Sequence, residues 1–212
     1  MIITNTPQKT LAKAVELKGI GLHSGKAIDL VLRPAAADCG FVFVRTDLDP
    51  QVEIPALAQY VSKTDRGTTL SVEGVDVQTT EHVLAALVGC GINNCRIELN
   101  GAEVPILDGS SKPFVEAIET AGIQDQEALQ EIFVVQENIH ITDEASGSEI
   151  LIVPAESTSL TVLIDFETKV LGTQNAVLHK MEDFPSEIAS SRTFSFLHEL
   201  ETLLEQNLIK GG

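Results

Sequence analysis

Glu81 and His82 are adjacent residues whose side chains could together activate a water molecule. They follow Thr79 and Thr80, either of which can cap a helix, so both are expected in the first turn of that helix. A histidine can bind Zn²⁺, which lowers the pKa of its bound water to roughly 7, and a neighbouring carboxylate can accept the proton. Taken alone, the two residues fit a simpler interpretation better, because an acidic side chain in a first turn complements the helix dipole. The H-E-x-x-H zinc motif is absent from the sequence.

His179 and Asp183 form a second pair with the spacing of metal ligands. At positions i and i+4 they would share one helix face and could both bind zinc. However, Pro185 and the N-cap position expected for Asp183 place this segment in the approach to a helix, where that spacing has no such meaning. We therefore do not predict metal binding by this pair.

The glycines between residues 19 and 25 suggest a phosphate-binding loop, but the spacing is wrong. The Walker pattern needs glycine at position 20 and serine or threonine at position 27, where Ile20 and Ala27 stand. A β-hairpin with Gly25 in its turn explains the same residues. His23, in that turn, could still face a site, but an exposed position is the one expected there.

The sequence predicts the same succession of strands and helices twice along the chain. These elements are expected to position the candidate residues. In the first pass, strands are expected at 11–22, 27–33, 41–45, 68–72 and 95–99, and helices at about 81–88 and 112–121. Ser110 or Ser111 can cap the second helix, and Gly122 suits its end. Asp108 is expected to accept hydrogen bonds from backbone amides in the turn before that helix.

A polar stretch over residues 124–130 predicts a linker. The second pass has strands at 132–135, 139–142, 150–153 and 160–166, a short helix after residue 183 and an amphipathic helix over 196–208. The predicted fold class is α+β, with two similar sheet-plus-helices domains, each a two-layer sandwich, in tandem. Residues 1–130 form the first predicted domain, which carries Glu81 and His82. Residues 131–212 form the second, which is incomplete.

The composition of the 212-residue chain excludes several classes of protein. Hydrophobic residues make up 43% and aromatic residues 4%, so an ordinary but mainly aliphatic core is expected. The formal net charge of −17 argues against binding nucleic acid or an anionic membrane, although one basic pocket for a phosphate-bearing substrate is compatible with it. We find no secretory signal, no transmembrane segment and no disulfide framework, since there are only three cysteines. A soluble, cytoplasmic protein is predicted.

Eight short segments along the chain match one known family in the same order. They are Gly21-Leu-His-Ser-Gly25, Leu32-Arg-Pro34, Arg45-Thr-Asp47, Thr79-Thr-Glu-His-Val-Leu-Ala-Ala86, Gly91-Ile-Asn-Asn94, Glu103-Val-Pro-Ile-Leu-Asp-Gly-Ser110, Ile164-Asp-Phe166 and Ser191-Arg-Thr-Phe194. In this combination the chain resembles the UDP-3-O-acyl-N-acetylglucosamine deacetylase family over essentially its whole length. The family's pair of α+β domains, with the active site between them, agrees with the two passes.

The resemblance implies a zinc-dependent hydrolase of lipid A biosynthesis in Gram-negative bacteria. Its reaction removes the N-acetyl group of UDP-3-O-(3-hydroxyacyl)-N-acetylglucosamine. By resemblance, His82 matches the first zinc ligand and Glu81 the general base. Thr193 matches the hydroxyl that stabilises the oxyanion, and Phe194 lies where the family contacts its nucleotide-sugar substrate.

The resemblance also implies that the chain is C-terminally truncated, near the insert of its second domain. The family's other histidine and aspartate zinc ligands, and its later acid histidine, lie beyond Gly212. Because His82 alone cannot form a three-ligand catalytic site, this chain is expected to be inactive and to bind zinc poorly. Some family members are fused to a fatty-acid dehydratase domain, so the parent protein could carry the same fusion.

Two other classes of protein stay open from the residues themselves. One is a non-catalytic α+β interaction module, in which Glu81 and His82 are merely helix-start residues. The other is a kinase-like, phosphate-binding enzyme, which the failed Walker spacing disfavours. Bound metal and the effect of Glu81→Ala distinguish the deacetylase from the interaction module, and nucleoside triphosphate binding would indicate the kinase-like enzyme.

Overall fold

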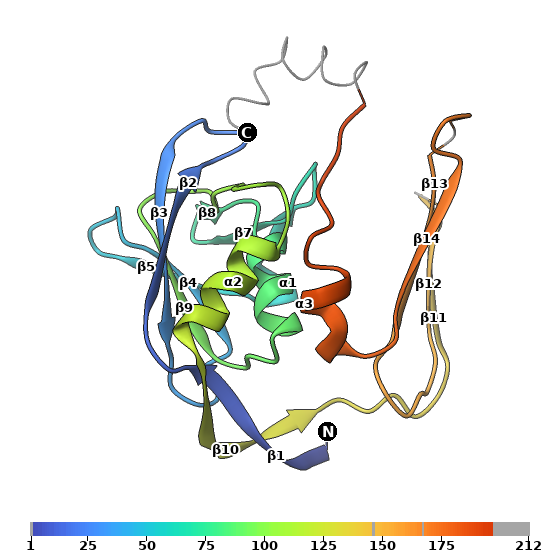
Figure 1. Cartoon of the computed structure of the whole chain (residues 1–212), viewed down its shortest axis with the longest axis horizontal. Helices are drawn as coiled ribbons and strands as arrows, with labels where there is room; N and C mark the ends of the chain where they lie inside the picture. The colour runs from blue at the N-terminus through green and yellow to red at the C-terminus, as the bar shows by residue number, and fades with distance from the viewer. Residues whose placement is uncertain (1, 146, 167, 197–212) are drawn as a thin grey trace.

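The structure, a computed structural model, describes residues 2–145, 147–166 and 168–196 (Figure 1). The amphipathic helix predicted over 196–208 falls outside these residues apart from its first position. None of the helices described is long and apolar enough to cross a membrane.

The first part of the chain is built on a five-stranded sheet in the order β2-β3-β9-β4-β5. Its strands are β2 (Val15–Ile20), β3 (Ala27–Pro34), β4 (Phe41–Arg45), β5 (Val52–Pro55) and β9 (Cys95–Leu99). Neighbouring strands are antiparallel except β4 and β9, which are parallel. In β3, every second side chain is buried apolar, which gives the sheet one face for a core.

Two helices, α1 (Glu81–Gly89) and α2 (Lys112–Ala121), pack beside each other against this sheet (Figure 1). Leu87 of α1 and Phe114 of α2 are fully buried in one cluster with Leu30, Phe43 and Ile97 of the sheet. Proline in its first turn favours the start of α2, and Gly122, with a φ of 73°, follows its end. The core is mainly aliphatic, as the composition predicts.

A smaller sheet leads directly into α1. After the short turn η1 (Ala58–Tyr60), the strands β6 (Val61–Lys63), β7 (Thr69–Val72) and β8 (Val75–Val77) form a three-stranded antiparallel sheet in chain order. The connection between β6 and β7, residues 64–68, lies against the first turn of α1, where Thr68 contacts Glu81.

The linker predicted over residues 124–130 is wrong, because these residues belong to a strand. β10 (Ile123–Ile132) pairs antiparallel with β1 (Ile2–Leu11) along the edge of the first part. The predicted strand at 132–135 is wrong too, since β10 ends at residue 132. The sequence did not indicate this strand because many of its side chains are polar. In the fold they have partners: Gln126 donates to the Ala35 carbonyl (3.0 Å) and Gln130 to the Pro7 carbonyl (2.9 Å).

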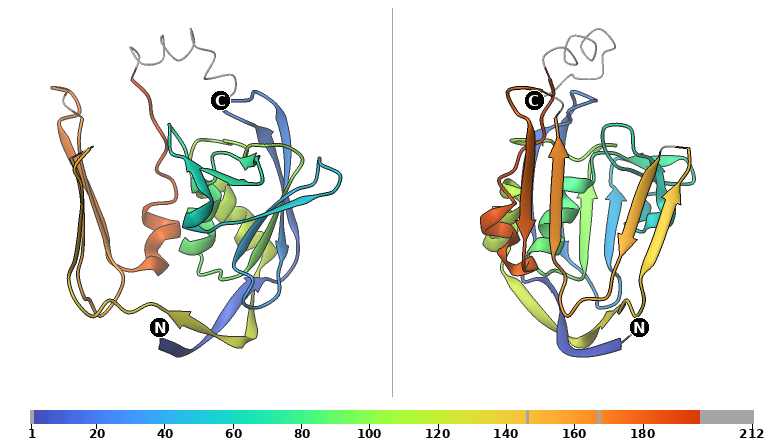
Figure 2. Two further views of the ribbon diagram at one scale, coloured as in Figure 1. Left: turned by 180° about the vertical axis from the view of Figure 1, so that it is seen from behind. Right: turned by 90° about the vertical axis from the view of Figure 1, so that its right-hand side faces the viewer.

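The second part of the chain contains two separate antiparallel hairpins. One pairs β11 (Ile139–Asp143) with β12 (Ser148–Ile152), and the other pairs β13 (Leu160–Asp165) with β14 (Thr173–Leu178). Both lie on the same side of the molecule, away from the central sheet (Figure 2). Apolar side chains on both hairpins are exposed: Ile141, Ile150, Leu151, Leu160, Val162 and Leu163.

A short turn and helix connect the second hairpin to the core. They are η2 (Met181–Asp183) and α3 (Phe184–Glu187). Phe184 and Ala189 belong to the buried cluster, and Gly89 at the end of α1 leaves no room for a Cβ against the Phe184 ring. The predicted α+β class is confirmed. The division into domains at residue 130 stays a prediction.

Candidate functional site

Glu81 and His82 occupy the first turn of α1, as the sequence predicts, and both are half-buried. Thr80 takes the N-cap position, but its hydroxyl donates to the Thr68 carbonyl (3.1 Å) and makes no capping bond. The predicted cap is therefore correct in position and wrong in its hydrogen bond. The hydroxyl instead ties the start of α1 to the small sheet.

The Glu81 carboxylate is held by the connection between β6 and β7. Its Oε2 accepts a 2.9 Å hydrogen bond from the Thr68 backbone amide. Its Oε1 would lie only 3.2 Å from a Cβ placed on Gly67. The absence of a side chain at residue 67 therefore gives the carboxylate room to take this orientation.

A cavity of about 560 Å³ opens beside this contact. It is lined by His23, residues 63–67, Thr69, Gln78 and Thr79. His23 is half-buried and lines the cavity, which fits the alternative that it faces a site and not the expected exposed position. Lys63 and Arg66 bring positive charge to the cavity even though the whole chain is strongly acidic.

The buried carboxylate of Glu103 explains why His23 lies there. It is only 1% exposed and accepts hydrogen bonds from the amides of His23 (2.9 Å) and Ser24 (2.8 Å). The Thr79 hydroxyl is 3.4 Å from the same carboxylate. Sequence reasoning missed this role for Glu103, because a glutamate is almost never fully buried unless it is paired, and its partners are evident only in the folded chain.

Thr193 lies beside the turn that precedes α2. Its amide donates to the Gly109 carbonyl (2.8 Å), and its methyl carbon would be 3.5 Å from a Cβ on Gly109. Next to it, the Arg192 guanidinium lies 3.7 Å from the Asp108 carboxylate. The same turn reaches α1, because the Ser111 hydroxyl donates to the His82 carbonyl (3.0 Å).

Asp108 accepts hydrogen bonds from the amide (3.0 Å) and the hydroxyl (2.7 Å) of Ser110, which confirms its predicted place in turn chemistry. Partial burial raises the pKa of Asp108, but these hydrogen bonds and the charge of Arg192 outweigh that effect, so the pKa lies below its ordinary value. The carboxylate is therefore charged near neutral pH and available to Arg192.

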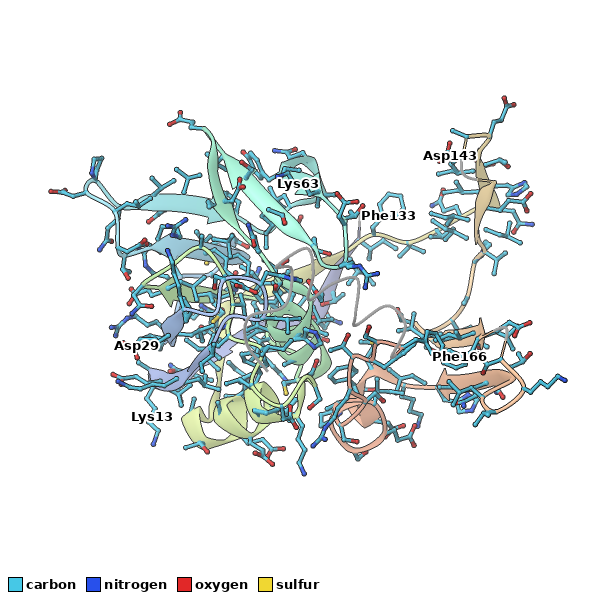
Figure 3. All side chains as sticks on the ribbon, turned by 90° about the horizontal axis from the view of Figure 1, so that it is seen from above. Lys13, Asp29, Lys63, Phe133, Asp143 and Phe166 are labelled. Carbon is cyan, nitrogen blue, oxygen red and sulfur yellow. The ribbon has the colours of Figure 1, made fainter. Side chains whose placement is uncertain are left out.

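Phe194 is 59% exposed and belongs to an aromatic cluster. Its ring packs edge-to-face on Phe166 (5.1 Å between centroids) and on Phe196 (5.7 Å). Figure 3 shows Phe166 on the second hairpin, away from the central sheet. The cluster therefore joins the β13–β14 hairpin to the segment that carries Thr193.

His179 and Asp183 do not share a helix face. His179 is exposed just after β14, and Asp183 ends η2 and takes the N-cap position of α3. Within residues 2–145, 147–166 and 168–196, no three His, Cys, Asp or Glu side chains are grouped so that they could hold a metal ion. A catalytic zinc ion needs three protein ligands. His82 would be one of them, and the described residues do not supply a complete set.

These features define an α+β protein with a candidate hydrolytic site, in which a carboxylate and an imidazole open α1 and one turn links them to Thr193. A family model for UDP-3-O-acyl N-acetylglycosamine deacetylase matches residues 8–212. The chain belongs to this family, which confirms the resemblance seen in the sequence.

Three relatives illustrate the match. The UDP-3-O-acyl-N-acetylglucosamine deacetylase of Myxococcus xanthus is 46% identical over 97% of this chain and 65% of its own length. The corresponding deacetylase of Hahella chejuensis is 42% identical over 97% of the chain and 68% of its own length. The bifunctional enzyme LpxC/FabZ of Bacteroides thetaiotaomicron is 43% identical over 97% of the chain and 44% of its own length. The chain thus spans between about half and two thirds of these relatives.

Proposed function

We propose that the protein carrying this chain is a zinc-dependent hydrolase. It removes the N-acetyl group of UDP-3-O-(3-hydroxyacyl)-N-acetylglucosamine in lipid A biosynthesis. The family match supports this proposal, and so do the deacetylase names of relatives above 40% identity. The observation that carries it is the pairing of Glu81 and His82 in one half-buried helix turn, which a single short turn connects to Thr193.

In this proposal Glu81 is the general base. Its carboxylate is oriented by the Thr68 amide and lies beside the cavity wall formed by residues 63–67. The fixed orientation suits proton transfer, which requires a base within hydrogen-bond reach of the proton that it accepts. His82 would be one ligand of a zinc ion, and the bound ion would supply a water of lowered pKa.

The Thr193 hydroxyl donates a hydrogen bond to the oxygen that gains negative charge as the amide of the substrate is attacked. Such preorganised donors stabilise developing charge without a reorganisation cost. Phe194, exposed in the neighbouring aromatic cluster, contacts the nucleotide-sugar substrate. Lys63 and Arg66 bring positive charge to the cavity next to Glu81, which is compatible with a phosphate-bearing substrate.

The remaining zinc ligands are proposed to come from outside the described residues. The relatives are longer than the matched region, and the described residues hold no group of three His, Cys, Asp or Glu side chains that could bind a metal ion. The 212-residue chain by itself is therefore proposed to be inactive and to bind zinc weakly. We place the parent protein in the cytoplasm, and a dehydratase fusion is proposed by analogy with the relatives named LpxC/FabZ.

The test uses the protein that contains this chain together with the further length found in its relatives. Acetate release and bound zinc are measured for the unchanged protein and for Glu81→Gln. A general base typically contributes about 10²–10⁴ in rate, so Glu81→Gln should lower kcat by that range and leave bound zinc nearly unchanged.

Glu116→Gln is the matched control, because this carboxylate is exposed on α2 and paired only weakly with Lys112 (3.8 Å). It should retain full activity. A metal-free protein that released no acetate, with or without Glu81→Gln, would instead support the interaction-module alternative.

A further inference from the structure

The turn Asp108–Ser111 contacts two segments that lie far apart in the sequence, and both carry proposed site residues. On one side it touches the first turn of α1 at His82. On the other it touches the 191–194 segment at Arg192 and Thr193.

The contact with α1 is made by the Ser111 hydroxyl, which does not cap α2. Ser111 takes the N-cap position of α2 but makes no capping bond there. The α2 cap is served instead by Ser110, whose hydroxyl accepts from the Lys112 amide (3.1 Å). Ser111 is only 8% exposed, so its hydrogen bond to the His82 carbonyl is largely shielded from competing water.

The contact with Thr193 is made through the backbone and reinforced by charge. The Thr193 amide donates to the carbonyl of Gly109, and Arg192 is attracted to Asp108. Asp108 also accepts the two hydrogen bonds from Ser110, so one carboxylate shapes the turn and lies within ion-pair distance of the neighbouring segment.

The backbone of the turn is locally fixed. Leu107 has a φ of 53° and Gly109 a φ of 80°, so two left-handed residues flank Asp108. A non-glycine residue with such a φ is uncommon and persists only where surrounding contacts maintain it. The Gly109 amide also donates to the Ile106 carbonyl (3.0 Å), which closes the turn.

We propose that the Asp108–Ser111 turn is the positioning element that fixes Thr193 relative to the first turn of α1. Asp108, Gly109 and Ser111 act through Thr193 and His82 and not on the substrate. The catalytic consequence rests on the proposed function, whereas the structural link can be tested without activity. A displacement of about 1 Å in such a group can lower a rate by about 10²-fold.

The first measurement is hydrogen exchange of backbone amides in the full 212-residue chain. In Asp108→Ala the turn loses both Ser110 contacts and the Arg192 pair, so the Thr193 amide should exchange about tenfold faster or more. Asp108→Asn keeps an acceptor for Ser110 and should give a smaller increase. Lys18→Ala removes a comparable exposed ion pair, with Asp29 (3.2 Å), and should leave Thr193 unchanged.

The second measurement is steady-state deacetylation by the longer protein. Asp108→Ala and Ser111→Ala should both lower kcat by about tenfold or more while KM changes little, since Thr193 acts on the transition state. Ser111→Ala leaves the Asp108 turn intact, so it separates positioning from general unfolding of the turn.

An unchanged Thr193 exchange rate in Asp108→Ala, in a chain that is folded by circular dichroism, would overturn the positioning role. Faster exchange accompanied by full kcat would overturn the catalytic part of it. Failure of the proposed function is distinguishable from both, because it would appear as no acetate release by the unchanged protein, or as full activity in Glu81→Gln, whatever happens at Thr193.

Discussion

The backbone amide of Thr68 donates a 2.9 Å hydrogen bond to Oε2 of Glu81. The contact is reciprocal, because the amide (3.3 Å) and hydroxyl (3.1 Å) of Thr80 both donate to the Thr68 carbonyl. Both polar backbone groups of Thr68, at the end of the β6–β7 connection, are thus hydrogen-bonded to residues at the start of α1. The orientation of the Glu81 carboxylate depends on this connection as much as on α1.

Gly67→Ala should impair the proposed reaction without unfolding the protein. The new Cβ would lie 3.2 Å from Oε1 of Glu81, so the carboxylate must shift by a few tenths of an ångström. Gly67 is not in the left-handed region, so alanine adds no backbone strain. We expect kcat of the longer protein to fall about tenfold, as measured by acetate release.

Gly74→Ala is the control for that variant. Gly74 has a φ of 81° and a Cβ there meets nothing within 4 Å. Alanine should therefore lower the free energy of unfolding by about 1 kcal/mol and leave kcat unchanged. Full kcat in Gly67→Ala would show that the carboxylate is not constrained from this side.

Phe184→Ala should strongly destabilise the protein. The ring is 8% exposed and packs against Gly89 at the end of α1, so its removal leaves a cavity in the core. We expect the free energy of unfolding to fall by about 3 kcal/mol in urea denaturation. Phe133→Ala is the matched control, because that ring is 75% exposed (Figure 3) and its loss should change stability by less than about 0.5 kcal/mol. Equal effects of the two substitutions would contradict the packing of α3 on α1.

Asp47→Asn should remove a pH-dependent part of the stability. A hydrogen bond from the nearly buried Arg45 guanidinium (2.8 Å) holds the pKa of Asp47 below its ordinary value. The stabilisation is therefore present above the unfolded pKa of about 3.9 and is lost as the pH falls through the lower folded value. Urea unfolding at pH 7 and at pH 3 should show a difference between wild type and variant that shrinks in acid. Asp29→Asn, in an exposed ion pair, is the control and should change the free energy of unfolding at pH 7 by less than about 0.5 kcal/mol.

Burial of two thiols should make the protein less stable in alkali. Burial raises the pKa of Cys95 to about 12 and that of Cys90 to about 11. Their neutral forms stabilise the fold fully below the unfolded pKa of roughly 8.5, and this contribution is lost as the pH rises toward the folded values.

Alkylation by iodoacetamide at pH 8, followed by mass spectrometry, tests the burial of the thiols on which this prediction depends. The exposed Cys39 should react first and Cys95 only when the protein unfolds. Rapid labelling of Cys95 in the folded chain would contradict its burial.

The strands and helices with strong local patterns could be predicted from the sequence. β4, β9 and α2 have the predicted bounds because each carries a local signal. β4 is a run of aromatic and β-branched residues, β9 alternates apolar and polar residues, and α2 has helical periodicity and is followed by a glycine. β1 and β10 were missed because their pairing joins residues more than a hundred positions apart, and their polar side chains find partners only in the folded chain.

The candidate site was predictable only in part. The residue types at 81 and 82 did not distinguish a catalytic pair from an ordinary helix start, and the family resemblance, which the comparisons confirm, made the difference. The side-chain hydroxyls of Thr80 and Ser111 donate to neighbouring segments and do not cap their own helices, which no local capping rule anticipates. The roles assigned to Glu81, His82, Thr193 and Phe194 stay predictions.

The donor that orients Glu81 is a main-chain group, and every amino acid except proline carries it. The side chain at position 68 can therefore change over evolution while the contact survives. A comparison of aligned sequences would not identify this position as important. A substitution library at this position should accept nearly all residues and reject proline, in contrast to the narrow tolerance expected one residue earlier.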